Sequence, residues 1–210
     1  MRTIVISILA LAIYSLNLMA DDQKPAEPTE KQLEDAKEAY AKFGAKYKTM
    51  KTPMAKRTLR TLCKFNMPMK TTDADLKGLP DLPFSFALDL YQTQVTDAGL
   101  RELKELKHLL WLNIRGTKVT DAGLRELTEL KLTGLFLGGK QFTDVVLKEI
   151  KELKQLTWLN LNGTKVTDEG LKELRELKQL ASVSLNGTQV TEAGIKEFQE
   201  ALPECKISKK

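Results

Sequence analysis

The sequence has few of the residues from which catalytic and metal sites are usually built. Its 210 residues include one histidine, His108, and two cysteines, Cys63 and Cys205. One imidazole and two distant thiols cannot supply the four ligands of a usual zinc site. His108 has no nearby nucleophile and base to work with, and no glycine-rich phosphate-binding motif is present. The sequence therefore predicts no enzymatic activity, no catalytic residue, no metal and no cofactor.

Long apolar runs are also scarce, and the one that is present lies at the start. Residues 1–20, MRTIVISILALAIYSLNLMA, carry a single charge at Arg2, and two aspartates follow Ala20 at once. A basic start, an apolar centre and a small residue before a polar segment are typical of a secretory signal peptide. We expect an exported protein, periplasmic or secreted. The alternative is a protein anchored in the membrane through the same segment left uncleaved.

The positive charge is unevenly placed. Residues 31–70 hold eleven Lys and Arg against three Asp and Glu, whereas residues 71–210 hold twenty against twenty-one. A basic segment attracts anionic partners, so contact with an anionic surface through residues 31–70 is one interpretation. A solvated helix face is the other. An exported chain whose larger part is nearly neutral predicts no nucleic-acid partner.

What the sequence has in abundance is repetition. One phrase, clearest as VTDAGLREL and VTDEGLKEL, returns five times, with separations of 24, 23, 24 and 24 residues. A short run of alternating apolar residues precedes each copy, as at Leu112 and Ile114. Strand-like alternation followed by helix-like spacing, at a period in the twenties, indicates a solenoid of stacked strand–helix coils. The five phrases begin at Val95, Val119, Phe142, Val166 and Val190.

Within a coil, each part of the pattern has a physical role. Leu112 and Ile114 point inward, because successive side chains of a strand face opposite sides of the sheet. Thr117 can bond the backbone of the turn, and Thr120 can cap the helix that follows. Asp121 then lies at the positive end of that helix. Stacked coils would hold Cys63 and Cys205 roughly 20–25 Å apart, too far for a disulfide, so we expect both to be buried and free.

Copies of the form L-x-x-L-x-x-L-x-L-x-x-T-x-V-T-D-x-G-L-x-x-L resemble bacterial leucine-rich-repeat proteins with 24-residue repeats, of the ribonuclease-inhibitor-like or GALA-type class. The resemblance covers about residues 71–207. It implies an α/β fold, a right-handed solenoid with a parallel sheet on the concave face and helices on the convex face. It also implies a recognition scaffold rather than an enzyme.

Around these repeats the chain divides into five parts. Thr29 and Gln32 fit a capping box, and Leu33 to Met50 continue at helical spacing, with a second short helix expected from Pro53 to about Cys63. We therefore expect a signal peptide (1–20), a linker (21–28), a basic α-helical N-terminal cap (29–70), repeats with a degenerate first copy (71–203), and a C-terminal capping strand and tail (204–210).

The candidate binding residues are those that the strands turn toward the concave face. The only two tryptophans, Trp111 and Trp158, occupy the same position of copies two and four, with Phe136 in the copy between them. At the strand spacing of about 4.8 Å, their rings would lie about 10 Å apart across a cleft. Exposed aromatics beside amides and an arginine are typical of an interaction hot spot. The full set is Tyr91, Trp111, Asn113, Arg115, Phe136, Trp158, Asn160 and Asn162.

The sequence thus predicts an exported, non-enzymatic scaffold that binds a protein or peptide on its concave face. A glycan is a second type of ligand that tryptophan and asparagine suit. The alternative function is that of a glycan-binding or envelope-associated protein held to an anionic surface by its basic N-terminal segment. A simpler view is that the rings only cover the sheet or contact that basic segment.

Overall fold

The computed structural model describes residues 27–53 and 59–210, so the expected signal peptide lies outside the described residues. Those residues form one eight-stranded sheet whose strands follow chain order. The first two strands pair antiparallel and all later neighbours pair parallel. The strands are β1 Lys46–Pro53, β2 Leu59–Asn66, β3 Phe86–Asp89, β4 Leu109–Asn113, β5 Gly134–Phe136, β6 Trp158–Asn160, β7 Ser182–Ser184 and β8 Lys206–Ser208.

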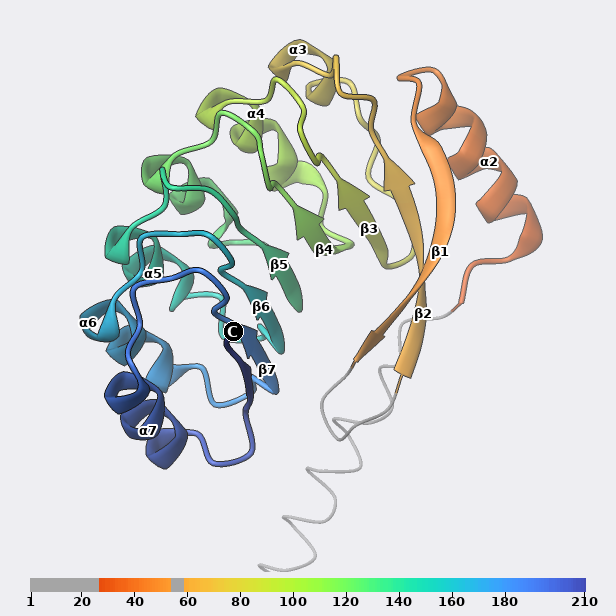
Figure 1. The fold of residues 1–210 in the computed structure, drawn as a ribbon. Coiled ribbons are helices and arrows are strands. Elements are labelled where there is room, and N and C mark those ends of the chain that lie inside the picture. The colour runs from red at the N-terminus through yellow and green to blue at the C-terminus, as the bar shows by residue number, and fades with distance from the viewer. Residues whose placement is uncertain (1–26, 54–58) are drawn as a thin grey trace, which may run out of the picture.

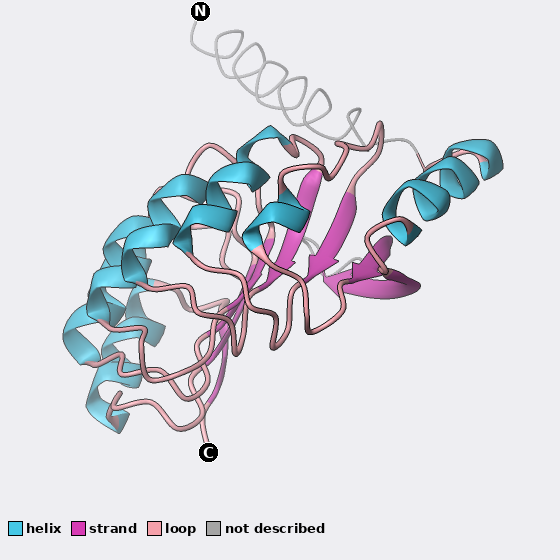
Figure 2. Ribbon diagram, turned by 90° about the horizontal axis from the view of Figure 1, so that it is seen from above, coloured by secondary structure: helices cyan, strands magenta, loops and turns pink. Residues whose placement is uncertain are grey.

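Short helices return the chain from one parallel strand to the next. Figure 1 shows an arc in which the strands line the inside and the helices lie outside, and Figure 2 shows the helices gathered on one side of the sheet. The α-helices are α2 Glu30–Ala41, α3 Asp73–Leu76, α4 Asp97–Glu102, α5 Asp144–Ile150, α6 Asp168–Leu171 and α7 Glu192–Ala201. The 3-10 helices are η2 Leu103–Glu105, η3 Asp121–Leu127 and η4 Lys172–Glu176. The expected parallel sheet with helices on one side is confirmed.

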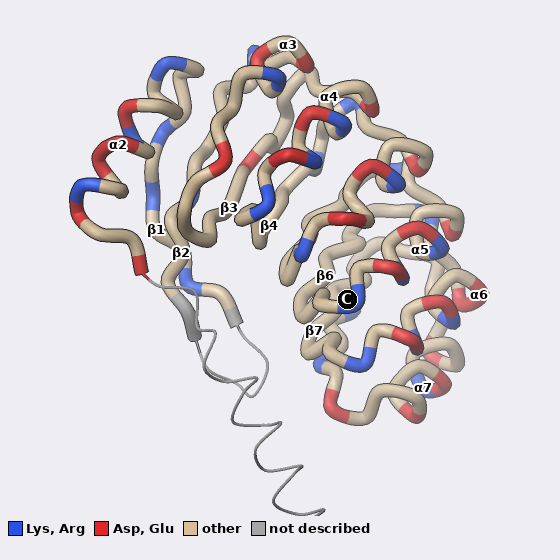
Figure 3. Tube along the Cα trace, turned by 180° about the vertical axis from the view of Figure 1, so that it is seen from behind, with Lys and Arg blue, Asp and Glu red and all other residues tan. Residues whose placement is uncertain are grey.

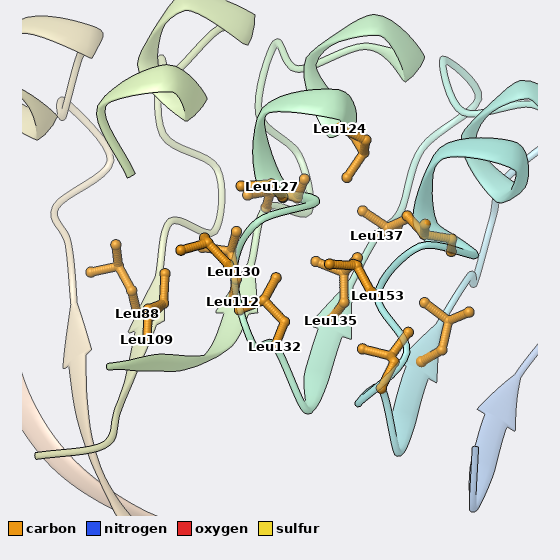
Figure 4. Close-up of a cluster of buried hydrophobic side chains, with 14 of the residues drawn as sticks. Leu88, Leu109, Leu112, Leu124, Leu127, Leu130, Leu132, Leu135, Leu137 and Leu153 are labelled. Atoms are coloured by element: carbon orange, nitrogen blue, oxygen red, sulfur yellow. The ribbon is translucent and has the colours of Figure 1, made fainter. Parts of the chain in front are cut away.

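The core fills the space between the sheet and the helices. Leu112 and Ile114 are fully buried, as are Leu135 and Leu137 in the next copy. Figure 4 shows leucines from strands and from helical segments meeting in this layer. No single coil covers its own leucines, since each lies against those of the coils before and after it. Stacking is therefore the source of stability, and the strand register follows from it.

A second set of contacts joins each coil to the next at the helix starts. The aspartate of one phrase accepts two hydrogen bonds from the threonine of the following phrase, N–H at 2.7–3.1 Å and O–H at 2.6–2.7 Å. The glycine of the phrase leaves room for that carboxylate: a Cβ at Gly123 would lie 2.3 Å from Asp97 Oδ1. The pairs of this Asp–Thr ladder are Asp73–Thr96, Asp97–Thr120, Asp121–Thr143, Asp144–Thr167 and Asp168–Thr191.

The N-terminal segment differs from the expected run of helices. The capping box is confirmed, because Thr29 and Gln32 exchange the two predicted hydrogen bonds at the start of α2. The helix ends before Gly44, whose φ of +75° is left-handed and suits glycine. From Lys46 the chain is strand, and Leu59–Cys63 is also strand, so the predicted extension to Met50 and the second helix are wrong.

The two cysteines and the C-terminal strand follow the sequence-based expectations. Cys63 and Cys205 are both free and buried. Ile207 pairs with Val183 in the short closing strand β8, at the 24-residue offset of the repeats. The turn threonines also act as expected, since the Thr117 hydroxyl donates to the carbonyl of Ile114 at 2.7 Å. The right-handed sense of the solenoid remains a prediction.

Candidate functional site

The inner face of the sheet, the surface that lines the arc, carries the predicted site residues in register. Trp111 is opposite Gly134, which is opposite Trp158. Two residues further along each strand, a second row on the same face consists of Asn113, Phe136 and Asn160. Equivalent side chains of successive coils therefore share one wall, as the repeat predicted.

The three large aromatic rings lie against one another rather than on two sides of a cleft. The ring centroids of Trp111 and Trp158 are 5.2 Å apart with an interplanar angle of 28°. Phe136 is 5.5 Å from Trp111 and 4.1 Å from Trp158. The predicted separation of about 10 Å is therefore wrong. These three rings form a single aromatic cluster that spans β4, β5 and β6.

Gly134 is the reason why the two tryptophans meet. A Cβ built on Gly134 would lie 2.2 Å from Cε2 and 2.3 Å from Cδ2 of Trp111. The indole therefore lies over bare backbone and fills the space in which a cleft was expected. Trp111 is only 4% exposed as a result, whereas Trp158 and Phe136 stay partly exposed. The exposed part of the cluster belongs to copies three and four.

Residues of the N-terminal hairpin help to bury Trp111. Leu62 of β2 and Ala87 of β3 form a small apolar cluster with Trp111, and Met50 of β1 packs against it. This cluster is separate from the main core, because it lies on the inner face of the sheet. The interpretation in which a ring contacts the basic segment is therefore correct for Trp111. Met50 and Leu62 were not predicted as site residues, since both had been assigned to helices.

A small hollow of about 80 Å³ opens beside this contact. Most of its lining is apolar, and Lys64 and Asn113 are its polar residues. Lys64 Nζ lies 2.6 Å from Asp89 Oδ2, and Asn113 Nδ2 donates to Asp89 Oδ1 at 2.9 Å. Asp89 thus pairs with the charge of Lys64 on one side and accepts a hydrogen bond from Asn113 on the other. The lining residues are Met50, Lys64, Ala87, Leu88, Trp111, Leu112, Asn113 and Phe136.

Two of the predicted asparagines bond the turns at the carboxyl ends of the strands instead of facing solvent freely. Asn160 is 7% exposed, and its Oδ1 accepts the backbone N–H of Asn162 at 3.0 Å. Asn162 Oδ1 accepts from the Ser184 hydroxyl and from the Asn186 N–H, both at 2.8 Å. Their carbonyl oxygens are therefore committed to turns, and the prediction of Asn160 as a surface amide is wrong.

Tyr91 and Arg115 form the exposed polar edge of the site. Tyr91 is 42% exposed, and the Arg115 guanidinium lies 5.7 Å from its ring centroid. Arg115 also extends over Gly138, where a Cβ would lie 3.1 Å from Arg115 Cγ and Nε. The third copy thus receives Trp111 at one glycine and Arg115 at the other. Both side chains of copy two lie flat along the wall because copy three leaves space for them.

The remaining chemistry-bearing residues lie apart from this face. Cys63 is buried on β2, and its burial raises the pKa of the thiol, so it is protonated at neutral pH. His108 is exposed in the turn before β4, with Nδ1 2.8 Å from Asp81 Oδ2. Within residues 27–53 and 59–210 no group of three His, Cys, Asp or Glu side chains is placed to hold a metal ion.

The comparisons agree with the repeat architecture. Residues 155–174 match the family described as Leucine Rich repeat. This stretch runs through β6 and α6, and the other parallel coils repeat its pattern. Residues 155–174 therefore carry one leucine-rich repeat, within an α/β array of parallel strands and helices.

No curated protein matches the chain. Among solved structures it is similar to an internalin (inlF) from Listeria monocytogenes, at 24% identity and a TM-score of 0.49. That match covers 64% of this chain, which spans 36% of the other chain. It is also similar to internalin C2 (inlC2) from the same organism, at 19% identity and a TM-score of 0.41, covering 67% of this chain and 84% of that one. Of the described helices, none has the length and apolar character needed to cross a membrane.

Proposed function

We propose that this protein is an exported, non-enzymatic recognition scaffold that binds a protein or peptide on the inner face of its sheet. The observation that carries the proposal is the partly exposed pair Phe136 and Trp158, whose ring centroids are 4.1 Å apart. The next copy has Ser182 and Ser184 at the same two strand positions. Aromatic side chains grouped beside an arginine are typical of binding hot spots.

The packing of the cluster supports this use of the surface. Trp111 supports the exposed rings from one side, so Trp158 and Phe136 lose little rotamer freedom when a partner covers them. Tyr91 and Arg115 extend the surface with groups that can stack and donate hydrogen bonds. A rigid aromatic centre with a polar edge is the usual composition of an interface.

The test uses substitutions that the array itself carries elsewhere. Trp158→Ser copies Ser182, and Phe136→Asn copies Asn113 and Asn160, so both retain strand-compatible residues. A library of random twelve-residue peptides on phage is selected on the wild-type protein, and the enriched peptides are measured on each variant. Binding should fall by about tenfold or more when a buried aromatic contact is lost.

The control is on the opposite side of the molecule. Val145 on α5 is 48% exposed, and Val145→Thr should leave binding unchanged. If the enriched peptides bind the Trp158 and Phe136 variants as well as the wild type, the inner face is not the binding surface.

Export is proposed from residues 1–20 and has its own test. The mature protein isolated from its host should begin at Asp21. A chain that retains Met1 and fractionates with membranes would instead support the anchored alternative.

A further inference from the structure

The charge on the inner face differs in kind from the charge elsewhere on the molecule. On the helical side, acids and bases pair from coil to coil, as in Arg101–Glu126 at 3.0 Å and Arg125–Glu149 at 2.9 Å. Figure 3 shows acidic and basic residues interspersed along the helices. On that side the charges cancel locally.

The strand positions of the inner face are almost all basic or neutral. Strand alternation places one lysine or arginine on this face in several strands, and β1 pairs Lys48 directly opposite Lys64. Asp89 is the one carboxylate at the described strand positions of this face, and it is already bonded to Lys64 and Asn113. The cations are Lys46, Lys48, Lys64, Arg115 and Lys206.

In the described part of the chain, the two opposed lysines share a single carboxylate partner, which lies beside Lys64. Like charges directly opposite on neighbouring strands destabilise a sheet. Asp89 neutralises Lys64, but within the described residues Lys48 forms no ion pair. An anionic group bound beside Lys48 would supply the counter-ion that Lys48 has not got among the described residues.

The hollow next to these lysines selects an occupant by its shape and apolar character. Met50, Ala87 and Phe136 give it apolar walls. Trp111 also lines it, and the Nε1–H of this buried side chain has no hydrogen-bond partner among the described residues.

We infer that the partner is an acidic peptide segment that places one apolar side chain in this hollow and its carboxylates near Lys48 and Arg115. This inference rests on the proposed function, because it names the chemistry of the ligand at the same face. A basic segment would lie against these cations, and at the described strand positions of the face the one carboxylate, Asp89, is already paired. A volume of about 80 Å³ suits one aliphatic side chain rather than a larger group.

The composition of the selected peptides is the first readout. Peptides that bind the wild type and lose binding to Trp158→Ser should carry net negative charge with an aliphatic residue between the acids. If the peptides that depend on Trp158 are neutral or basic, this inference is wrong and the proposed function stands. If no peptide depends on Trp158 or Phe136, both fail.

Two lysines of the same strand provide a matched pair of variants. Lys48→Gln removes a charge from the inner face, whereas Lys51→Gln removes one from the other face of β1. For an acidic peptide, Lys48→Gln should weaken binding about two- to fivefold, which is the range of an exposed ion pair. Lys51→Gln should have no effect. Equal effects from both lysines would show general attraction rather than a site, and would overturn the inference.

A peptide series and a lipid arm complete the test. Replacing the aliphatic residue of an enriched peptide by serine should cost about tenfold or more in affinity, because apolar burial is lost. Vesicles of anionic phosphatidylglycerol are tested with the same two lysine variants. If Lys48→Gln reduces vesicle binding but leaves peptide binding unchanged, the basic face recognises a membrane surface and not a peptide.

Discussion

Replacing Gly134 by alanine tests the central feature of the site, the indole that lies on bare backbone. The added Cβ would come within 2.2 Å of Trp111 Cε2 and 2.7 Å of Cε3, far inside van der Waals contact. The backbone itself does not resist the change, because Gly134 is not among the residues with positive φ. The indole must therefore move, and the 5.2 Å stack with Trp158 must change.

The expected cost is that of overpacking a well-filled site, about 1–3 kcal/mol of unfolding free energy. Because the chain has two tryptophans and both belong to this cluster, near-ultraviolet circular dichroism and intrinsic fluorescence report on it directly. Gly134→Ala should change both spectra and lower the midpoint of urea unfolding. Peptide binding should weaken together with the spectral change.

Gly163→Ala is the matched control. Its φ is +72° and no atom lies within 4 Å of the added Cβ, so only backbone strain is introduced, about 1 kcal/mol. This variant should lose stability and keep the wild-type tryptophan spectra. If Gly134→Ala has the same tryptophan spectra and the same stability as the wild type, Trp111 does not lie over Gly134 and the description of the site is wrong.

Three further predictions concern stability and reactivity. Gln92 has a φ of 57° at the turn position where later copies have glycine, so its backbone is strained. Gln92→Gly should therefore raise the unfolding free energy, measured by urea titration, by about 0.5–1 kcal/mol. A decrease would contradict the strain. The Thr191 hydrogen bonds hold the pKa of Asp168 below its ordinary 3.8, so their stabilisation is present above that pH and lost as pH falls through the lowered pKa. Thr191→Val should therefore flatten the loss of stability in acid, and an unchanged acid profile would count against the ladder. Burial raises the pKa of Cys205 to about 12 and also that of Cys63, so Ellman's reagent should label neither thiol in the native protein and both after unfolding; rapid native labelling would refute their burial.

Much of the fold could be predicted because the same strand and helix-start pattern recurs in every copy. The alternation at Leu112 and Ile114 and the Thr-Asp start of each helix recur in phase, so local preference and stacking agree. The N-terminal hairpin had no such repetition. Tyr47 and Met50 fit the helical spacing that runs from Leu33, but in β1 they lie on opposite faces, Tyr47 toward the main core and Met50 on the inner face. The helix has already ended before the left-handed Gly44.

For the candidate site, the sequence predicted that Trp111 and Trp158 share one face of the sheet but not how their rings pack on it. Strand parity placed Trp111 and Trp158 on one face, and that part is confirmed by the register. The direction in which an indole leans depends on the space beside it, and at Trp111 that space is the bare backbone of Gly134. The contact of Met50 with Trp111 required the hairpin, so it could not be anticipated from a helical cap.

The Asp–Thr ladder was not anticipated, although its signal is in the sequence. Thr-Asp recurs at the repeat interval, which brings each aspartate beside the next threonine once coils stack. Within one coil the threonine is the N-cap of its own helix and the aspartate the partner of that helix's dipole, so the pattern of a single copy does not point to a contact between coils. In the structure Asp97 also bonds Thr120 of the following coil, so one carboxylate serves two helix starts.

The Asp–Thr ladder has a direction. In each inner coil the aspartate bonds the threonine of the next coil, and the threonine is bonded by the aspartate of the coil before. Asp168 to Thr191 is built like Asp97 to Thr120, with N–H distances of 2.7 Å in both. If a whole coil between them were removed or duplicated, each remaining aspartate would still lie beside a threonine in the same geometry. The length of the wall, and with it the length of a ligand that the wall can hold, is thus free to change in steps of one coil. Within a coil the contact tolerates a change of one residue, since Asp121 bonds Thr143 across 22 residues and Asp97 bonds Thr120 across 23.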